Sequence, residues 1–257
     1  MIRAILYKRN IMQFAGKEYD GKGVKIALID SGINQEELNM PFEQCMRYSL
    51  ALQATNHVRI AEGGRDVHGH GTKVAKCILG HLPKVELLSI QVTDAEFRVG
   101  ADLLAAGIEL AYKSNASIIH VSMGTSNMGR ALLLRDICVA AREHGAIVVA
   151  SAHPKGERTY PADIPEVIGV SSNQECRSLF HFPKDIYPKK QWKGFSNKFL
   201  APAYMGSVYG GVGCATAYVS SFMAMLTQAF PEDTPEKRID RLANRAFWPT
   251  IELGYDS

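Results

Sequence analysis

The stretch VKIALID, residues 24–30, decides the fold class of this chain. It is apolar except for Lys25 and its final aspartate, with glycines before it and Ser31-Gly32 after it. A short apolar run between turn residues predicts a strand that is buried on both faces. The fold then depends on what separates this strand from others like it.

Apolar runs of the same kind alternate with helical stretches along the chain. This alternation predicts a mostly parallel sheet flanked by helices, because a strand covered on both faces must be apolar throughout. We expect one three-layer α/β domain over residues 1–257, with an N-terminal extension at 1–18 and a polar surface excursion at 174–198. Further strands are expected at 85–92, 117–123, 146–152 and 166–172, and helices at 70–80, 100–115 and 131–145.

The composition argues against several classes of protein. The formal charge is only +3 and the basic residues are scattered, which disfavours nucleic-acid binding. No apolar run reaches the roughly 18–20 residues that a membrane span needs. Arg3, Lys8 and Arg9 interrupt the apolar residues of the N-terminus, so it lacks the apolar core of a secretory signal. We expect neither nucleic acid nor a membrane as a partner.

The five cysteines are odd in number, widely spaced and without a Cys-x-x-Cys pair. This pattern fits reduced thiols in a cytoplasm better than a disulfide scaffold or a zinc site. We therefore expect a cytoplasmic protein without a metal or cofactor, and a secreted mature form is the alternative. The cysteines are Cys45, Cys77, Cys138, Cys176 and Cys214.

Candidate catalytic residues lie beyond the strand ends, where function collects in parallel sheets. Asp30 ends the first strand, although an aspartate there is often only a turn residue. The block DVHGHGT, residues 66–72, holds His70 between two glycines at the start of a predicted helix. Glycine lacks a Cβ, so its backbone can approach another element closely. His68 precedes the helix, and we expect this competing histidine to be a loop residue.

The stretch GGVGCATAYVSSFMAML, residues 210–226, is a small-residue turn that leads into a helix. Such a junction presents one side chain beside free backbone N–H groups, which suits a nucleophile and an oxyanion hole. We predict that Ala215 occupies the outward position, although its methyl group has no chemistry. Asp30, His70 and this junction follow one another in one of the known orders of a catalytic triad.

The chain resembles the subtilisin-like serine proteases over residues 19–246. GVKIALIDSGI is similar to the family's catalytic-aspartate strand, and HGHGTKVA to its catalytic-histidine helix. SIIHVSMGT resembles the strand of the family that pairs with bound peptide. YPADIPEVIGV resembles the Tyr-Pro loop and the strand after it, and TPEKRIDRLANRA resembles the C-terminal helix. GCATA lies on the Gly-Thr-Ser-x-Ala motif of the family, which puts Ala215 at the serine position.

The resemblance implies a subtilisin-like fold and the cleavage of peptides or proteins that bind in an extended form. Asp30 would orient His70, which would act as general base and then as general acid. The backbone N–H of residue 215 would be one oxyanion donor. Ser122, Met123 and Gly124 would pair with the substrate backbone and wall the first specificity pocket. Thr125 and Ala152 would be further substrate-binding residues.

The chain departs from the family pattern in four places. Ala215 cannot form an acyl-enzyme. His153-Pro154 stands where the family has its oxyanion Gly-Asn pair, and the His153 N–H is a candidate donor. The connection GHLPK is too short for the family's calcium loop, so we expect no calcium there. We also expect no pro-domain of the folding-chaperone type.

Two explanations for Ala215 remain open. An engineered Ser→Ala change, made to stop self-digestion or to trap a peptide, is favoured because Asp30, the His70 block and the junction are all retained. The alternative is a natural pseudoprotease that binds extended peptides without cleaving them. Cys214 as nucleophile is disfavoured because adjacent side chains diverge. An α/β-hydrolase is disfavoured because the chain has no Gly-x-Ser-x-Gly.

Overall fold

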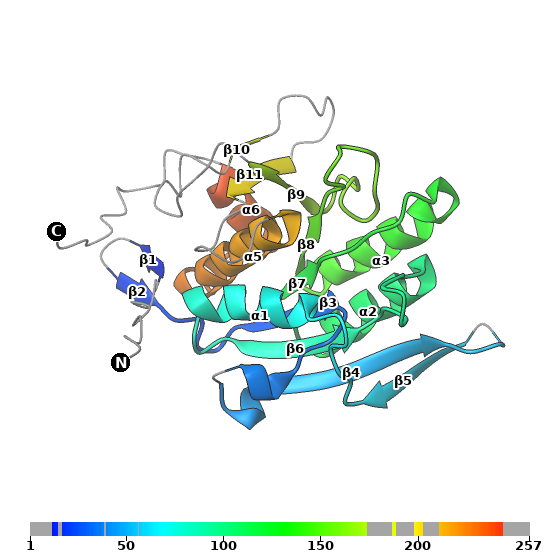
Figure 1. Cartoon of the computed structure of the whole chain (residues 1–257). Coiled ribbons are helices and arrows are strands. Elements are labelled where there is room, and N and C mark those ends of the chain that lie inside the picture. Colours follow the sequence, from blue (N-terminus) through cyan, green and yellow to red (C-terminus); the bar gives the residue numbers. More distant parts are fainter. Residues whose placement is uncertain are drawn as a thin grey trace.

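The structure is a computed structural model that describes residues 12–14, 17–38, 40–55, 57–173, 187–188, 198–202 and 211–243. Helices cover both faces of a central sheet (Figure 1). One face carries α1 (His70–His81), α5 (Val212–Ala229) and α6 (Pro235–Ala243). The opposite face carries α2 (Ala101–Lys113) and α3 (Ala131–Glu143).

The central sheet has nine described strands in the order β10-β11-β9-β8-β7-β3-β6-β4-β5. All neighbours from β11 to β4 are parallel, whereas β10 and β5 pair antiparallel at the two edges. The predicted three-layer α/β fold with a mostly parallel sheet is therefore confirmed. The strands are β3 (Lys25–Asp30), β4 (Cys45–Leu52), β5 (Val58–Glu62), β6 (Glu86–Gln91), β7 (Ile118–Val121), β8 (Ile147–Ser151), β9 (Ile168–Asn173), β10 (Tyr187–Pro188) and β11 (Lys198–Pro202).

Each face of the sheet has its own hydrophobic core, and β3 contributes to both. Ile26 and Leu28 lie in the core beneath α1, α5 and α6, whereas Ala27 and Ile29 lie in the core beneath α2 and α3. Successive side chains of a strand point to opposite faces, so a central strand between two helical layers has no polar side. This is the physical reason why residues 26–29 of the strand are all apolar.

The sheet order reverses at β3. After β3 the chain forms β4, β5 and β6 on one side, and then crosses to β7, β8 and β9 on the other. The loops at such a point leave in opposite directions and open a crevice at the carboxyl ends of the strands. Asp30 is the last residue of β3, and Ser122 directly follows β7. The Ser122 N–H donates to the Ile29 carbonyl at 3.3 Å, which brings the two strand ends together.

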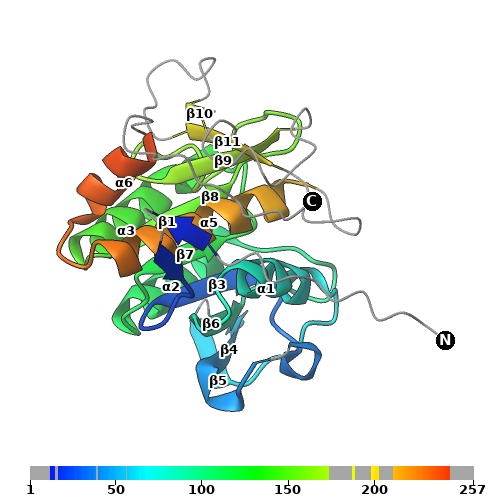
Figure 2. The ribbon, with the colours of Figure 1, turned by 90° about the vertical axis from the view of Figure 1, so that its left-hand side faces the viewer.

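The hairpin of β4 and β5 is the main element that the sequence did not predict. It extends the sheet on the side away from α5 and α6 (Figure 2). Met46, Leu52 and Ile60 are exposed large hydrophobic residues on this hairpin, so its strands lack a clean alternation of buried and exposed positions. The predicted strands and the helices expected at 70–80, 100–115 and 131–145 begin and end within two residues of the expected positions. The predicted C-terminal helix at 234–246 is described as α6 and ends at Ala243.

The two ends of the predicted domain are described only in part. The extension at 1–18 contains a small hairpin of β1 (Met12–Phe14) and β2 (Lys17–Tyr19). The predicted excursion at 174–198 lies outside the described residues, apart from 187–188 and 198. Within the described part of the chain, no helix combines the length and the apolar character that crossing a membrane requires.

Candidate active site

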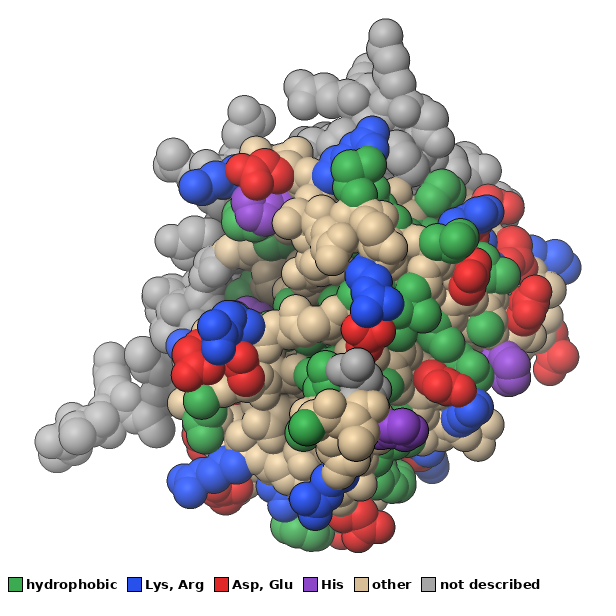
Figure 3. All heavy atoms as spheres, turned by 90° about the vertical axis from the view of Figure 1, so that its right-hand side faces the viewer, with side chains coloured by type: hydrophobic (Ala, Val, Ile, Leu, Met, Phe, Trp, Pro, Cys, Tyr) green, Lys and Arg blue, Asp and Glu red, His purple; other side chains and the backbone are tan. Residues whose placement is uncertain are grey.

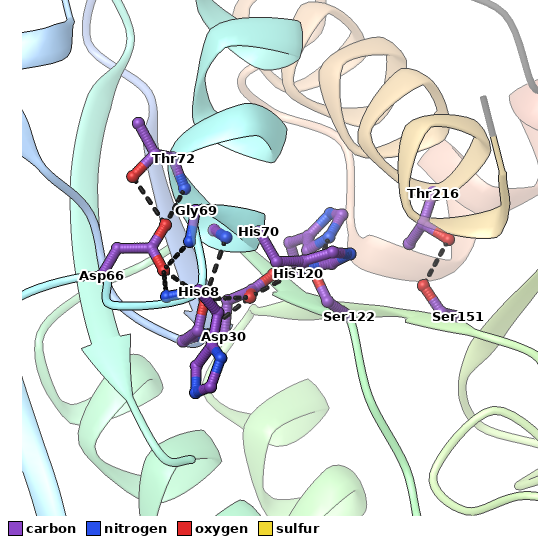
Figure 4. Close-up of polar contacts among 12 residues, drawn as sticks. Asp30, Asp66, His68, Gly69, His70, Thr72, His120, Ser122, Ser151 and Thr216 are labelled. Atoms are coloured by element: carbon purple, nitrogen blue, oxygen red, sulfur yellow. Dashed lines mark hydrogen bonds and ion pairs between the residues drawn. The ribbon is translucent and has the colours of Figure 1, made fainter. Parts of the chain in front are cut away.

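Asp30 and His70 meet at the carboxyl end of β3 (Figure 4). Asp30 is fully buried, and the His70 Nδ1–H donates to its two carboxylate oxygens at 2.9 and 3.0 Å. A carboxylate can only accept, so in the neutral ring Nε2 keeps a free lone pair. The hydrogen bond to Asp30 raises the pKa of His70 above its ordinary value, against the effect of burial. His70 can therefore take up a proton at Nε2 and be stabilised as a cation.

Glycines on both sides of His70 let α1 begin against β3. Gly69 has φ of +72°, a left-handed conformation that disfavours other residues. A Cβ on Gly71 would lie 2.2 Å from the Gly32 carbonyl oxygen, so only glycine fits there. The predicted close approach is confirmed at Gly71, and it is what brings His70 within reach of Asp30.

The buried carboxylate of Asp66 holds the first turn of α1. Its Oδ1 accepts from the backbone N–H groups of His68 and Gly69 at 3.1 and 2.7 Å. Its Oδ2 accepts from the Thr72 N–H at 2.8 Å and the Thr72 hydroxyl at 2.6 Å. Gly69 is the N-cap of α1 and Thr72 lies in its first turn, and a helix start leaves such N–H groups without an intrahelical partner. Asp66 therefore fixes His70 indirectly, through the backbone that carries it.

The residue opposite the free nitrogen of His70 is Gly213, in the first turn of α5. A Cβ at this position would lie 3.2 Å from Nε2 and 3.4 Å from Cε1 of His70. A hydroxyl one bond further out would be within hydrogen-bond reach of Nε2. Gly213 belongs to the helix and is not among the glycines with positive φ, so the backbone conformation permits a side chain. Position 213 is therefore the place where a nucleophile would meet His70.

The predicted place of Ala215 is wrong. Ala215 is fully buried among the residues of the core beneath α5. It follows Gly213 by two residues, and two helical residues turn the side-chain direction by about 200°. The predicted use of its N–H as an oxyanion donor is also wrong, because that N–H donates to the Gly211 carbonyl at 3.3 Å.

The error has a simple origin in the sequence. GVGCA, residues 211–215, and GCATA, residues 213–217, both begin with glycine and end with alanine, as Gly-Thr-Ser-x-Ala does. Only the start of the helix separates the two frames. Because α5 starts at Val212, the first frame puts Gly213 at the serine position and buries Ala215. The first N–H groups of α5 have no intrahelical partner and are the remaining oxyanion candidates.

The segment after β7 lies beside the site, but not all of it can pair with a substrate. The Ser122 hydroxyl is 2.9 Å from Nε2 of His120, and the Ser122 N–H is used within the sheet. The N–H and C=O of Thr125 are both bonded to Tyr160, at 2.9 and 2.8 Å. The Thr125 backbone is therefore paired within the protein, and the substrate contact of Thr125 stays a prediction. Met123 and Gly124 stay predicted substrate contacts.

His153 and Ala152 follow β8. Ala152 is buried, and its N–H donates to the Val170 carbonyl at 2.8 Å. The His153 side chain is partly exposed, and its Nδ1 lies 4.0 Å from a carboxylate oxygen of Glu157. Nδ1 has no hydrogen-bond partner within the described residues. The oxyanion role of His153 and the substrate-binding role of Ala152 stay predictions.

Two aromatic residues at the site went unnoticed in the sequence. The Phe97 ring packs edge-on against His70, with ring centroids 5.5 Å apart, and against His68 at 4.9 Å. Phe97 has φ of +61°, which no local pattern predicts for a bulky residue. His120 is fully buried between the hydroxyls of Ser122 and Ser220, each at 2.9 Å. Its only sequence signal is a polar residue inside an apolar strand.

The described residues show neither a cluster of metal-binding side chains nor, on the face of Figure 3, a surface on which charges of one sign gather. Within them, no group of three or more His, Cys, Asp or Glu side chains converges on one point. On the face shown in Figure 3, basic and acidic side chains are interspersed rather than separated into fields. His68 takes no part in the site's hydrogen bonds to Asp30, and its Nε2 lies 3.2 Å from the Asp94 carbonyl.

Two solved protease structures superimpose on this chain. A cold-adapted subtilisin-like serine proteinase superimposes with a TM-score of 0.66 at 18% identity, over 90% of this chain and 86% of that one. The prenylagaramide maturation protease PagA superimposes with a TM-score of 0.59 at 22% identity, over 81% of this chain and 76% of that one. At these identities the likeness concerns the fold.

Sequence comparison gives the family. The model of the Subtilase family matches residues 21–203, and the chain therefore belongs to this family of subtilisin-like serine proteases. Subtilisin E of Bacillus subtilis is 28% identical over 248 residues, which cover 89% of this chain and 61% of the relative. The minor extracellular protease Epr of the same organism is 26% identical over 83% of this chain and 33% of the relative. The chain thus spans about one third to three fifths of the length of these relatives. The family match ends before position 213.

Proposed function

We propose that this chain is a subtilase domain that binds an extended peptide beside His70 but does not cleave it through a serine. The observation that carries the proposal is Gly213, whose Cβ position would lie 3.2 Å from Nε2 of His70. A glycine offers no hydroxyl to attack a carbonyl, so no acyl-enzyme can form at this position. The proposal takes up the pseudoprotease alternative, with Gly213 in place of Ala215.

The rest of the site supports a binding role. The Asp30–His70 hydrogen bond and the hydrogen bonds of Asp66 hold His70 and the start of α1 in place without a nucleophile. Met123 and Gly124 follow β7 beside this crevice, and they would bind the peptide backbone by strand addition. Backbone pairing gives affinity with little sequence specificity, so side-chain pockets beside the strand would select the peptide.

A serine endopeptidase whose nucleophile has been replaced is the second candidate. The retained Asp30–His70 pair favours it, because a general base without a nucleophile has no catalytic use. Under this reading the parental chain has a serine at 213. Both candidates share the peptide site and differ in whether the chain ever cleaved what it bound. We place either one in the cytoplasm, on the strength of cysteines that form no disulfide in the described part of the chain.

Peptide binding is tested with an immobilised library of random dodecapeptides. A peptide that the chain retains is then resynthesised with one backbone amide N-methylated at a time. Strand addition predicts that methylation weakens binding at alternate positions only, because every second amide of a strand faces its partner. Each methylated peptide keeps its side chains, so the unaffected alternate positions serve as internal controls.

Three results would contradict the proposal. Equal losses at all amides, or none, would exclude recognition through a paired backbone. Retention of no library peptide by the chain, while the Gly213→Ser variant cleaves the same library, would favour the replaced endopeptidase. Binding that is unaffected by His70→Trp, which fills the crevice, would place the peptide elsewhere on the molecule.

A further inference from the structure

Two buried cysteine thiols face each other between α1 and α5. The sulfur atoms of Cys77 and Cys214 lie 3.7 Å apart, and both side chains are almost fully buried. A disulfide bond needs a separation of about 2.05 Å, so the two sulfurs are in contact but not bonded. Cys45 and Cys138 are also buried, and neither forms a disulfide within the described part of the chain.

The two cysteines lie on the same two helices as the residues of the candidate active site. Cys77 follows His70 by seven residues on α1, which places it about two helical turns further along the same face. Cys214 is the residue next to Gly213 on α5. The two thiols therefore connect the helix that carries His70 to the helix that carries the position opposite its ring.

We infer that Cys77 and Cys214 form a redox-active dithiol, which a hydroperoxide oxidises to a disulfide that joins α1 to α5. The thiolate of one cysteine attacks the peroxide, which breaks the O–O bond, forms a sulfenic acid and releases water or an alcohol once protonated. The second thiol displaces the sulfenic oxygen as water and forms the S–S bond. Each sulfur loses one electron, and the peroxide gains the two.

The surroundings indicate which thiol reacts first. Either sulfur can donate in the contact between the two thiols. With Cys77 as the donor, this hydrogen bond and the charge of His70 lower the pKa of Cys214. The same hydrogen bond and burial raise the pKa of Cys77. The thiolate is the nucleophile, so Cys214 would be the attacking residue and Cys77 the resolving one.

The disulfide would act on the site through Gly213. Closing the gap from 3.7 Å to about 2.05 Å draws residue 214 towards α1. The Cβ position of Gly213 already lies 3.2 Å from His70 and 3.7 Å from Val74, so this movement changes the space beside the His70 ring. Oxidation would thus alter the crevice, whichever of the two proposed functions it has.

The test uses the whole chain and inorganic hydrogen peroxide. After graded oxidation, free thiols are alkylated and the protein is digested with trypsin. Each cysteine falls in its own tryptic peptide, with Cys77 in residues 77–84, Cys214 in 199–237 and Cys138 in 136–142. We expect a cross-linked species of the first two peptides, two hydrogen atoms lighter than their sum, which dithiothreitol returns to the separate peptides.

The matched variants are Cys138→Ser and Cys77→Ser. Cys138→Ser should form the cross-link as the unmodified chain does. Cys77→Ser should give no cross-link and instead accumulate sulfinic acid on Cys214, because the resolving thiol is missing. If Cys77 and Cys214 remain alkylated separately at peroxide levels that oxidise surface methionines, the inference fails. It also fails if Cys214 cross-links equally with Cys45, Cys138 or Cys176. Neither result bears on peptide binding, so the two proposals are tested separately.

Discussion

The buried His120 should make the protein sensitive to acid in a defined window. His120 is fully buried between two serine hydroxyls, and burial lowers its pKa from 6.5 to about 4. The carboxylate of Asp30 acts in the opposite direction, and the positive charge of His70 adds to the effect of burial. In the unfolded chain, His120 takes up a proton near its ordinary pKa, whereas in the folded chain it stays neutral.

The sign and size of the His120 contribution to stability follow from proton linkage. Stability rises with pH wherever the unfolded state binds more protons, so this contribution falls as pH drops from about 6.5 to about 4. One pKa unit corresponds to about 1.36 kcal/mol, so the drop from neutral pH to about pH 4.5 is on the order of 2–3 kcal/mol. Below that window the loss levels off, because both states are then protonated.

The perturbation is His120→Asn, which cannot titrate and keeps a polar group facing Ser220. Urea unfolding of both proteins is measured at several pH values from neutral to about pH 4.5, and the free energies of unfolding are compared. We expect the unmodified chain to lose about 2–3 kcal/mol more than the variant across this range. The carboxylates titrate in both proteins, so their effect cancels in the difference.

The readout is the slope of the free energy of unfolding against pH, and the absolute stability of the variant does not decide the test. A variant that is less stable at every pH but has the smaller slope agrees with the reasoning. Parallel curves, with a difference that changes by less than about 0.5 kcal/mol, would refute it. They would mean that His120 is already as easily protonated in the folded state as in the unfolded one.

Three further changes test the way in which His70 is held. Gly71→Ala should cost about 3 kcal/mol or more in urea unfolding, because its Cβ would lie 2.2 Å from a backbone oxygen, whereas Gly100→Ala meets nothing and should cost under about 1 kcal/mol. Equal costs would contradict the close approach. Asp66→Ala should cost roughly 3 kcal/mol by leaving backbone N–H groups of α1 unpaired, and a cost below about 1 kcal/mol would show that water replaces the carboxylate. His70→Ala should destabilise more near pH 5.5 than near pH 9, because Asp30 raises the pKa of His70 and its stabilisation is lost as pH rises through that pKa. A cost that grows with pH would contradict this assignment.

The fold could be predicted from sequence because short apolar runs alternate with helical stretches along the chain. A central strand such as β3 contributes side chains to both cores, so both of its faces are apolar. The β4–β5 hairpin could not be predicted in this way. It lies at the sheet edge, where exposed residues such as Met46 and Ile60 weaken the pattern and pairing depends on a distant strand.

The site was predictable only where geometry follows from local sequence. Gly71 and Asp30 locate His70, because a glycine-flanked histidine at a helix start has one way to approach a strand end. Gly213 was missed because two frames of the same small-residue stretch fit the motif equally well. Helix phase decides between them, and a shift of two residues turns a side chain from the crevice into the core. Residues such as Phe97 meet His70 only through tertiary structure.

The central claim is that position 213, and not position 215, faces the ring of His70. The most direct test compares Gly213→Ser with Ala215→Ser by intact-mass spectrometry after treatment with a fluorophosphonate. We predict one stoichiometric adduct on Gly213→Ser, its loss in the Gly213→Ser/His70→Ala double variant, and none on Ala215→Ser, whose hydroxyl would be buried in the core. An adduct on folded Ala215→Ser with none on Gly213→Ser would contradict the account.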